Sequence, residues 1–292
     1  MKEVNGLKIF TTFEDKLEYT KELIHCWYEA WDGNVYVAFS GGLGSTVLLH
    51  IIRSLYPDVK GVFNNTGLEY PEIIQHVRTF DNIVELRPKK NFKEVIDQYG
   101  WPIISKEQSQ FIQQYNNAKS EKTKNTRLNG NKWGRGKISE KWKYLIDAPF
   151  NISEVCCNHL KKNPAKIFEK ESGLMPFLGN MAQESAFRAQ NLKIYGCNSY
   201  EKKRPSSKPL SYWTQDDLWN YIKQNDVKYS KIYDMGYTRT GCMFCMFGVH
   251  LEKFPNRFQK MQLTHPHQYD FIINKLNGGD VLDYIKVNYV NN

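Results

Sequence analysis

A short apolar run that leads into a loop of serine and glycine constrains the fold most. Residues 35–39 are apolar and rich in β-forming side chains, which predicts a buried strand. The loop Ser-Gly-Gly-Leu-Gly-Ser-Thr follows directly, and residues 46–56 have apolar positions on one side, which predicts a helix that ends at Pro57. Glycines let a backbone approach an anion, and amides at a helix N-terminus point toward it. The unit therefore predicts a phosphate-binding loop made of Ser40, Gly41, Gly42, Gly44, Ser45 and Thr46. A tight turn that uses glycine for its geometry alone is the alternative.

The alternation of strand and helix continues along the chain. Residues 59–64 and 83–86 predict two more strands, with a helix over residues 70–80 between them. A helix over residues 12–31 comes before this series. Strand, helix, strand, helix, strand is typical of an α/β protein with a doubly wound, mainly parallel sheet. A short strand at residues 176–178 and a helix over residues 214–224 extend the pattern.

Residues 116–143, called the basic segment below, interrupt this alternation. They are rich in Lys, Arg, Asn and Gly, with Trp133 and Trp142 between them. One interpretation is a solvated, mobile insertion without a ligand. The other is an arm that binds a nucleic-acid backbone and offers its aromatic rings to bases. We expect a nucleotide-binding α/β domain over residues 1–250 that carries this insertion, followed by a helical extension over residues 251–292.

Charge and hydropathy indicate the class of protein. The formal net charge of +9 favours polyanionic partners such as nucleotides or nucleic acid. No apolar run reaches about 18 residues, and the N-terminus lacks the apolar core of a signal peptide. We therefore expect a cytoplasmic protein without a membrane partner. Six cysteines in such a chain point to metal or redox chemistry more than to structural disulfides.

Four of the cysteines form two pairs, Cys156-Cys157 and Cys242-x-x-Cys245. Two pairs of thiolates suit either zinc or an iron–sulfur cluster. The adjacent pair is awkward for a zinc knuckle, which usually takes two Cys-x-x-Cys units. Two buried pairs of reduced thiols are the alternative. Of the other cysteines, Cys26 is expected in the core of its helix, whereas Cys197 is either a packed side chain or a reactive thiol.

Several segments, in order along the chain, resemble the phosphoadenosine phosphosulfate (PAPS) reductase family of the adenine-nucleotide α-hydrolase, or PP-loop, superfamily. The loop is similar to the family's Ser-Gly-Gly-Lys-Asp-Ser, with Leu43 at the lysine position and Gly44 at the aspartate position. Residues 65–72 resemble its Asp-Thr-Gly…Pro-Glu element, with Asn65 in place of the aspartate. Residues 179–188 resemble Gly-x-Arg…Glu-Ser…Arg, although Met181 stands where arginine is common. Residues 209–222 and 233–242 are similar to the later segments.

The resemblance implies which residues act. It implies an adenine nucleotide (ATP, APS or PAPS, with or without Mg), held by the phosphate loop together with Thr66, Gly67 and Arg239. It also implies catalytic roles for Ser45 and Arg188. The Cys-Cys…Cys-x-x-Cys layout is similar to the 4Fe–4S site of the APS reductase branch. That likeness implies a role for Lys161 near cluster and nucleotide, and the cluster ligands Cys156, Cys157, Cys242 and Cys245.

One departure divides the functional hypotheses. Sulfonucleotide reductases carry a nucleophilic cysteine near the C-terminus in a Glu-Cys-Gly-x-His segment, but no cysteine follows Cys245 here. The first hypothesis is an iron–sulfur enzyme that uses ATP for sulfur transfer or nucleotide activation on nucleic acid, in a branch often carried by phages and mobile elements. The second is a sulfonucleotide reductase with Cys197 as its nucleophile. The third is a non-catalytic binding module for nucleotide or nucleic acid, suggested by Leu43 and Gly44.

Further expectations concern partners and surface residues. The first hypothesis implies a thiol or sulfur-donor protein as a partner, and the sequence leaves a homo-oligomer open. We expect His265 and His267, in a His-Pro-His run, at the surface.

Overall fold

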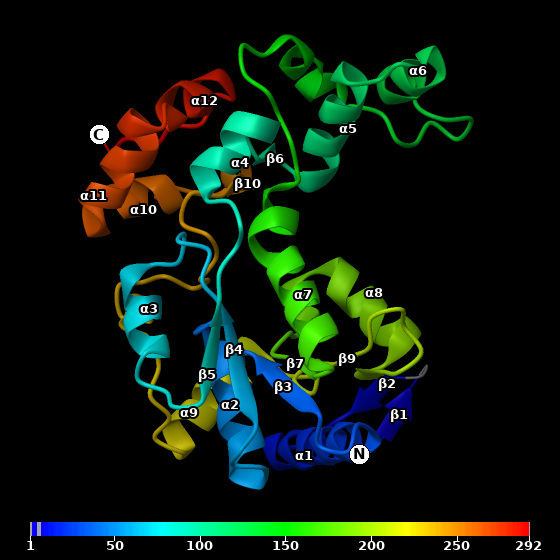
Figure 1. Ribbon diagram of the computed structural model, residues 1–292, viewed down its shortest axis with the longest axis vertical. Helices are drawn as coiled ribbons and strands as arrows, with labels where there is room; N and C mark the ends of the chain where they lie inside the picture. The colour runs from blue at the N-terminus through cyan, green and yellow to red at the C-terminus, as the bar shows by residue number, and fades with distance from the viewer. Residues whose placement is uncertain (1, 5–6, 292) are drawn as a thin grey trace. The chain divides into compact units, whose positions relative to one another are not determined.

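The computed structural model describes residues 2–4 and 7–291, and the chain divides into two compact units (Figure 1). Unit 1 comprises Met1–Asn65, Glu69–Arg87 and Pro164–Thr240. Unit 2 comprises Thr66–Leu68, Pro88–Asn163 and Gly241–Asn292. Residues 88–163 thus belong to the same compact unit as the C-terminal helices. The predicted domain boundary at residue 250 stays a prediction.

Unit 1 contains a six-stranded sheet in the order β5-β4-β3-β7-β9-β8. All neighbouring strands are parallel except β8 and β9. Val37 pairs with Gly61 on one side and with Phe177 on the other, so β3 lies at the centre, where the order of the strands reverses. The predicted α/β fold with a mainly parallel sheet is confirmed. The strands are β3 (Val35–Ala38), β4 (Lys60–Asn64), β5 (Ile83–Leu86), β7 (Met175–Leu178), β8 (Asn198–Ser199) and β9 (Ser206–Ser207).

Helices flank this sheet, and apolar residues at helical spacing bury them. In α2 (Leu43–Leu55), Val47, Leu48, Ile51 and Ile52 have no exposed surface. This helix begins three residues earlier than predicted, because Gly42 is its N-cap and the buried Leu43 already belongs to the first turn. The other helices of the unit are α1 (Phe13–Ala30), α3 (Pro71–Val77), α7 (Asn163–Ser172), η3 (Ala182–Glu184), α8 (Ala186–Tyr195), α9 (Gln215–Gln224) and η4 (Lys231–Tyr233). A short hairpin of β1 (Lys2–Val4) and β2 (Leu7–Ile9) lies near the N-terminus.

Unit 2 is mainly helical around one short parallel strand pair. β6 (Ile103–Ile104) pairs with β10 (Met246–Phe247), so the stretch after the second cysteine pair contacts the middle of the chain. The C-terminal part of the chain is helical, as predicted. Its elements are α10 (Arg257–Thr264), α11 (Pro266–Asp270), η6 (Phe271–Lys275) and α12 (Gly278–Tyr284). The remaining ones are α4 (Phe92–Tyr99), α5 (Lys106–Asn116), α6 (Glu121–Asn129), η1 (Glu140–Asp147), η2 (Asn158–Lys162) and η5 (Val249–Leu251).

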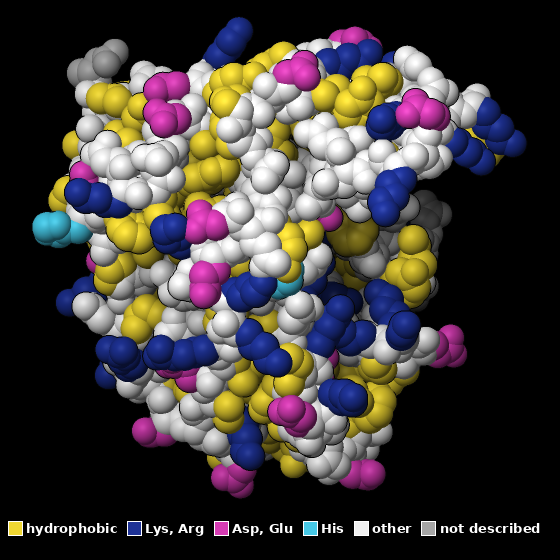
Figure 2. Space-filling model, turned by 45° about the horizontal axis from the view of Figure 1, so that its top comes forward, with side chains coloured by type: hydrophobic (Ala, Val, Ile, Leu, Met, Phe, Trp, Pro, Cys, Tyr) yellow, Lys and Arg dark blue, Asp and Glu magenta, His cyan; other side chains and the backbone are white. Residues whose placement is uncertain are grey.

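The basic segment has defined structure. It contains α6, a loop and the start of η1, and Figure 1 draws this loop as a projection beyond α6. Figure 2 shows Lys and Arg side chains over much of the face in view, including its upper right. Trp133 is 70% exposed, but Trp142 is only 9% exposed, so the prediction that both aromatics are free to stack is wrong for Trp142. Trp142 packs edge-on against His250 instead.

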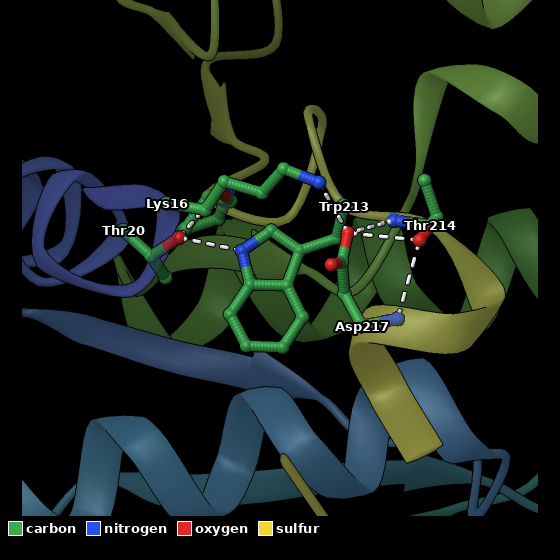
Figure 3. A network of polar contacts seen from close by, with 6 residues as sticks. Lys16, Thr20, Trp213, Thr214 and Asp217 are labelled. Carbon is green, nitrogen blue, oxygen red and sulfur yellow. Dashed lines mark hydrogen bonds and ion pairs between the residues drawn. The ribbon is translucent and has the colours of Figure 1, made fainter. Parts of the chain in front are cut away.

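A polar network joins α1 to the start of α9 in unit 1 (Figure 3). The indole Nε1 of the buried Trp213 donates to Thr20 Oγ1 at 2.8 Å. Lys16 Nζ lies 2.6 Å from Asp217 Oδ2, and the same carboxylate accepts from the Thr214 amide at 2.7 Å. The Thr214 hydroxyl in turn accepts from the Asp217 amide, which completes a capping box. Trp213, Thr214 and Asp217, which lie in a segment that resembles the PAPS reductase family, therefore stabilise the fold of unit 1.

Two further positions differ from the sequence prediction. Cys26 is exposed, because the core-facing side of α1 is occupied by its neighbour Trp27, which has no exposed surface. His265 is buried at the start of α11, with its Nδ1 2.8 Å from Thr264 Oγ1, while His267 is exposed as predicted. Among the described residues, no helix is both long enough and apolar enough to cross a bilayer.

Candidate functional site

The phosphate loop follows the central strand of unit 1, at the point where the strand order reverses. In open α/β sheets, ligands bind outside the carboxyl ends of the strands at such a switch point. Gly41 has φ +72°, and a Cβ there would lie 2.8 Å from Val77 Cγ2 and 2.9 Å from Ile73 Cγ2 on α3. The loop therefore requires glycine at this position, both for its conformation and for its packing.

Ser45 holds the loop in shape. Its Oγ accepts from the Ser40 amide at 3.1 Å and donates to the Gly42 carbonyl at 2.9 Å. The Ser40 hydroxyl oxygen also lies 3.1 Å from Ser45 Oγ. Ser45 is 6% exposed, whereas Ser40 is exposed. Of the two predicted hydroxyl donors, Ser40 is thus the one that faces solvent.

Thr46 does not contribute its side chain to the loop surface, contrary to the prediction. It has no exposed surface, and its Oγ1 lies 3.1 Å from His76 Nε2 in the interior of unit 1. Its amide donates to the Gly42 carbonyl at 2.9 Å. The residue is helical, so its side chain packs between α2 and α3 and does not point to a ligand at the N-terminus of α2.

The first turn of α2 contacts a residue that the sequence analysis did not assign to the site. Helix geometry leaves the amides of a first turn without intrahelical acceptors. One of them, the Leu43 amide, donates to the Tyr233 hydroxyl at 2.9 Å, and that hydroxyl lies 3.5 Å from Thr240 Oγ1. The segment that resembles Tyr-Asp-x-Gly-Tyr contains Tyr233, which was the only signal for it.

The two family positions that differ in this loop are both enclosed. Leu43 is 4% exposed. A Cβ on Gly44 would lie 2.6 Å from the Gly179 carbonyl oxygen, and one on Gly179 would lie 2.7 Å from the Gly44 carbonyl. Real Cβ contacts of this length with backbone atoms do not occur, so the two glycines depend on each other. The backbone leaves no room for the aspartate that is usual at position 44.

Two arginines supply positive charge in unit 1. Arg188 forms an ion pair with Glu184, and the Glu184 carboxylate also accepts from the Met181 amide at 2.8 Å. Burial lowers the pKa of Arg188, and the charge of Arg239 lowers it further, which places the two guanidinium groups close enough to repel each other. Because Glu184 pairs with Arg188, the charge of Arg239 leaves a net positive charge near this pair, which suits an anion.

Thr66 and Gly67 belong to unit 2. Thr66 is 4% exposed, and its Oγ1 accepts from the Leu68 amide at 3.2 Å. Gly67 has φ +75°, and a Cβ there would meet no atom within 4 Å. Their predicted role in nucleotide binding stays a prediction.

All four paired cysteines line one cavity in unit 2. Cys156 and Cys157 precede η2, with their sulfurs 4.0 Å apart, and Cys242 and Cys245 lie in a turn that leads into β10. In that turn the Cys245 amide donates to the Cys242 carbonyl at 3.1 Å. The other lining residues are apolar apart from Lys161, and none is a carboxylate; they are Leu68, Phe92, Pro102, Leu160 and Lys161.

Cations surround the cysteine cavity. The pKa of Cys157 is lowered, first by a hydrogen bond from Cys156 and then by the positive charges of Lys106 and Lys161. Burial raises the pKa of Cys245, while a backbone hydrogen bond from Phe247 and the charge of Arg257 act against this. Arg257 also donates to the Cys245 carbonyl at 2.8 Å. Lys106 and Arg257 are further members of this site that the sequence analysis missed, because neither lies within a cysteine motif: Lys106 begins α5 and Arg257 begins α10.

The four thiols around one cavity are a donor set that could hold a metal ion or an iron–sulfur cluster. Across residues 2–4 and 7–291, no three His, Cys, Asp or Glu side chains are arranged to hold one metal ion. A four-thiolate zinc site requires all sulfurs about 2.3 Å from one atom. In a cluster the cysteines bind different irons, so the sulfurs lie farther apart. The separation of 4.0 Å between the sulfurs of Cys156 and Cys157 is compatible with either arrangement.

Comparison with known proteins identifies the family. The family model described as the phosphoadenosine phosphosulfate reductase domain matches residues 34–247. This chain belongs to the PAPS reductase family. The matched region begins just before β3 and ends two residues after Cys245, so it spans the phosphate loop and all four paired cysteines.

Several relatives are similar over most of the chain. An uncharacterized protein of Methanocaldococcus jannaschii is 28% identical over 245 residues, which cover 80% of this chain but only 41% of that relative. The adenosine 5′-phosphosulfate reductase of Geobacillus kaustophilus is 23% identical over 219 residues, 75% of each chain. A solved structure of a PAPS reductase from Candida auris has a TM-score of 0.45 and 18% identity, and covers 81% of this chain and 97% of that one.

Cys197 has an environment that opposes the nucleophile role considered for it within the PAPS reductase family. It is 4% exposed in unit 1, and burial raises its pKa to about 11, although a hydrogen bond with Ser211 and the charge of Lys208 act in the opposite direction. The thiolate, not the thiol, is the nucleophile of cysteine chemistry. At neutral pH this side chain is therefore protonated and shielded.

Proposed function

We propose that this PAPS reductase family protein is an iron–sulfur enzyme that binds an adenine nucleotide, with ATP favoured, and uses it for sulfur transfer or nucleotide activation. The observation that carries the proposal is the convergence of four cysteines, from two distant parts of the sequence, on one cavity that also contains Lys161. We favour a cluster over structural zinc or buried free thiols, because the Cys-Cys…Cys-x-x-Cys layout resembles the 4Fe–4S site of the APS reductase branch.

Cys156, Cys157, Cys242 and Cys245 would hold a 4Fe–4S cluster. When bound, such a cluster supplies iron sites that accept electrons or bind sulfur. The protein's own residues provide the environment. Lys106 and Lys161 offset the negative charge of the thiolates, and the Phe247 amide donates to the Cys245 sulfur. Hydrogen bonds to ligand sulfurs and nearby charges tune such centres.

The phosphate loop would bind the nucleotide through backbone amides. The N-terminus of α2 attracts anions, because its amides and its dipole point the same way. Arg188 and Arg239 supply positive charge in the same unit, where the family's loop lysine is replaced by Leu43. In the activation step, an acceptor oxygen attacks the α-phosphorus of ATP and pyrophosphate leaves. A sulfur donor then displaces AMP from the acceptor. Mg²⁺ would offset the charge of the leaving pyrophosphate.

Anaerobic purification with iron and sulfide analysis tests the cluster. We expect a brown protein with about four irons and four sulfides per chain. Cys245→Ala should lose the iron and the colour, whereas Cys26→Ala, which changes an exposed cysteine of unit 1, should keep both. A colourless protein that contains zinc and no sulfide would refute the assignment.

A binding screen of ATP against APS and PAPS tests the nucleotide. ATP should bind most tightly and should release pyrophosphate when the acceptor is present. Ser45→Ala should weaken ATP binding, because it removes the hydroxyl that holds Ser40 and Gly42 in place. Ser54→Ala is the matched control, since its hydroxyl bonds only within α2, to the Ile51 carbonyl. No nucleotide binding at all would exclude the proposal.

A sulfonucleotide reductase is the second candidate, and the Geobacillus kaustophilus relative favours it. This candidate requires a nucleophilic thiol outside the cysteine cavity. Cys197 is the residue considered for it, and the charge of the neighbouring Lys208 acts to lower its pKa. Reduction of APS or PAPS that is abolished in Cys197→Ser would establish this candidate. Pyrophosphate release from ATP in the same variant would exclude it, and would also exclude a non-catalytic binding module.

A further inference from the structure

Most of the formal net positive charge of the protein comes from the basic segment. Residues 116–143 contain nine Lys and Arg and two Glu, and hence carry a net +7 of the chain's formal +9. The rest of the chain is therefore almost neutral. Outside the segment, 31 Lys and Arg are nearly balanced by 29 Asp and Glu, whereas the segment has cations almost without acids, and this imbalance requires an explanation.

The loop of the basic segment has a fixed conformation. Asn131 Oδ1 accepts from the amides of Trp133 and Arg135, at 2.9 and 3.0 Å. The Asn131 amide donates to the Arg135 carbonyl at 2.8 Å. Gly130 has φ +93°, and a Cβ there would lie 2.8 Å from the Gly134 carbonyl carbon. These contacts form a tight turn and fix the position of the Trp133 backbone.

Arg127 fastens this loop to the rest of unit 2. Its Nε donates to Gln114 Oε1 on α5 at 2.8 Å, and its Nη1 donates to the Gly136 carbonyl at 2.5 Å. The guanidinium lies 4.4 Å from the centre of the Phe111 ring. One cation of the segment is therefore used to hold the loop, and the loop is attached to an ordered helix.

The fixed loop presents one indole ring beside several cations. Trp133 is 70% exposed, and Lys132 Nζ lies 4.2 Å from the centre of its ring. Lys124 and Lys143 pair with glutamates of the segment itself. The other cations of the segment, apart from Arg127, are exposed; they are Lys119, Lys122, Lys132, Arg135, Lys137 and Lys141.

We infer that the basic segment binds single-stranded nucleic acid, with Trp133 as the surface on which an unpaired base stacks and the exposed cations as contacts to the phosphates. Base–aromatic stacking and a cationic track are the two components of such binding. A duplex keeps its bases stacked on one another, and an acidic protein would need the cations but not a bare indole face. Strand binding itself does not depend on the proposed function. The further step, that the bound nucleic acid is the acceptor of the activation reaction, rests on the proposed function.

Fluorescence anisotropy with labelled strands of about 20 nucleotides tests the inference on the full chain without added nucleotide. Trp133→Ala should weaken binding about 5- to 150-fold, while Trp133→Phe, which keeps an aromatic face, should recover most of the affinity. The triple variant Lys132→Gln, Arg135→Gln and Lys137→Gln should reduce the slope of log affinity against log salt by about 2, at ~0.7 per phosphate contact. Separate measurements with DNA and with RNA strands of the same sequence show whether the protein prefers deoxyribose or ribose.

A matched control separates local contacts from overall charge. The triple variant Lys60→Gln, Lys170→Gln and Lys223→Gln removes the same charge at exposed positions outside the basic segment, and should bind like the wild type. Equal losses in the two triple variants, or tighter binding of a duplex than of a single strand, would overturn the inference. So would unchanged affinity in Trp133→Ala.

The two proposals fail separately. Strand binding without iron or ATP binding would refute the proposed function and keep the inference. Iron and ATP binding in a protein that binds no strand would do the reverse. The variants of the basic segment should bind ATP normally, because they change no residue of the phosphate loop.

Discussion

The dependence of stability on pH tests whether His76 is buried in its neutral form. His76 is 6% exposed, and its Nε2 lies 3.1 Å from Thr46 Oγ1. The rings of Phe39 and Phe80 pack on the imidazole, with centroids 6.3 and 5.0 Å away. Burial disfavours the charged ring and lowers the pKa of His76 from 6.5 to about 4.

The magnitude follows from this difference in pKa. The unfolded chain takes up a proton near pH 6.5, whereas the folded chain does not do so until about pH 4. The folded pKa is the lower one, so the stabilisation is complete above pH 6.5 and is lost as the pH falls toward 4. A gap of about 2.5 pH units at 1.36 kcal/mol per unit gives about 3 kcal/mol of unfolding free energy for this one group.

Denaturant unfolding of the wild type and of His76→Gln, compared from about pH 7.5 to 4, measures this contribution. Glutamine can still hydrogen-bond to Thr46 but does not titrate, so the wild type should lose about 3 kcal/mol relative to the variant across the range. His50, whose pKa burial also lowers, is present in both proteins and cancels. His267→Gln, at an exposed position, should follow the wild type. Identical pH slopes in wild type and His76→Gln, or an NMR titration midpoint for His76 near 6.5, would refute the reasoning.

Three further substitutions test the geometry of unit 1. Gly44→Ala should lower the free energy of unfolding by about 1–3 kcal/mol and weaken ATP binding, because the clash of its Cβ with the Gly179 carbonyl outweighs a helix-propensity gain of ~1 kcal/mol. In chemical denaturation, the control Gly241→Ala, whose Cβ would meet no atom within 4 Å, should be as stable as the wild type, and an equally stable Gly44→Ala would contradict the contact. Tyr233→Phe should lower ATP affinity about fivefold by calorimetry without unfolding the protein, because the loop amide loses its acceptor; unaltered affinity would show that the hydroxyl does not shape the loop. Asp217→Asn should lower the melting temperature through a loss of about 1–2 kcal/mol, because the cap of α9 and the ion pair to α1 both weaken, and an unchanged midpoint would count against that network.

The local parts of the fold could be predicted from the sequence, but the contacts between distant parts could not. The strand–loop–helix at residues 35–56 follows from apolar periodicity and glycine, which act over a few residues. The start of α2 was misplaced because its first turn is fixed by burial of Leu43, which is a tertiary contact. The pairing of Thr46 with His76 depends on how α2 packs on α3, and no local signal reports it. Strands β8 and β9 are two residues long, which is too short for periodicity to show.

The candidate metal site shows the same limit. The resemblance to the APS reductase branch predicted the four cysteines and Lys161, and the structure places all five around one cavity. Spacing alone left zinc and free thiols open. Lys106 begins α5 and Arg257 begins α10, so they reach the cysteines only through the packing of unit 2. Such residues are invisible to a search for motifs, because their role depends on charge and distance and not on sequence neighbours.

The loop's two departures from the family pattern have a common physical cause. The first turn of α2 is enclosed: Leu43 is 4% exposed, and Gly44 is in contact with the backbone of Gly179. A lysine at position 43 would have to bury its ammonium group, and a buried charge without a partner is costly. The loop can therefore offer a phosphate its amides and dipole but not a cation of its own. If the loop binds a nucleotide as proposed, positive charge for it would come from other residues. Arg188 and Arg239 are the candidates in unit 1, because the charge of Arg239 lowers the pKa of Arg188 and an anion would relieve that repulsion.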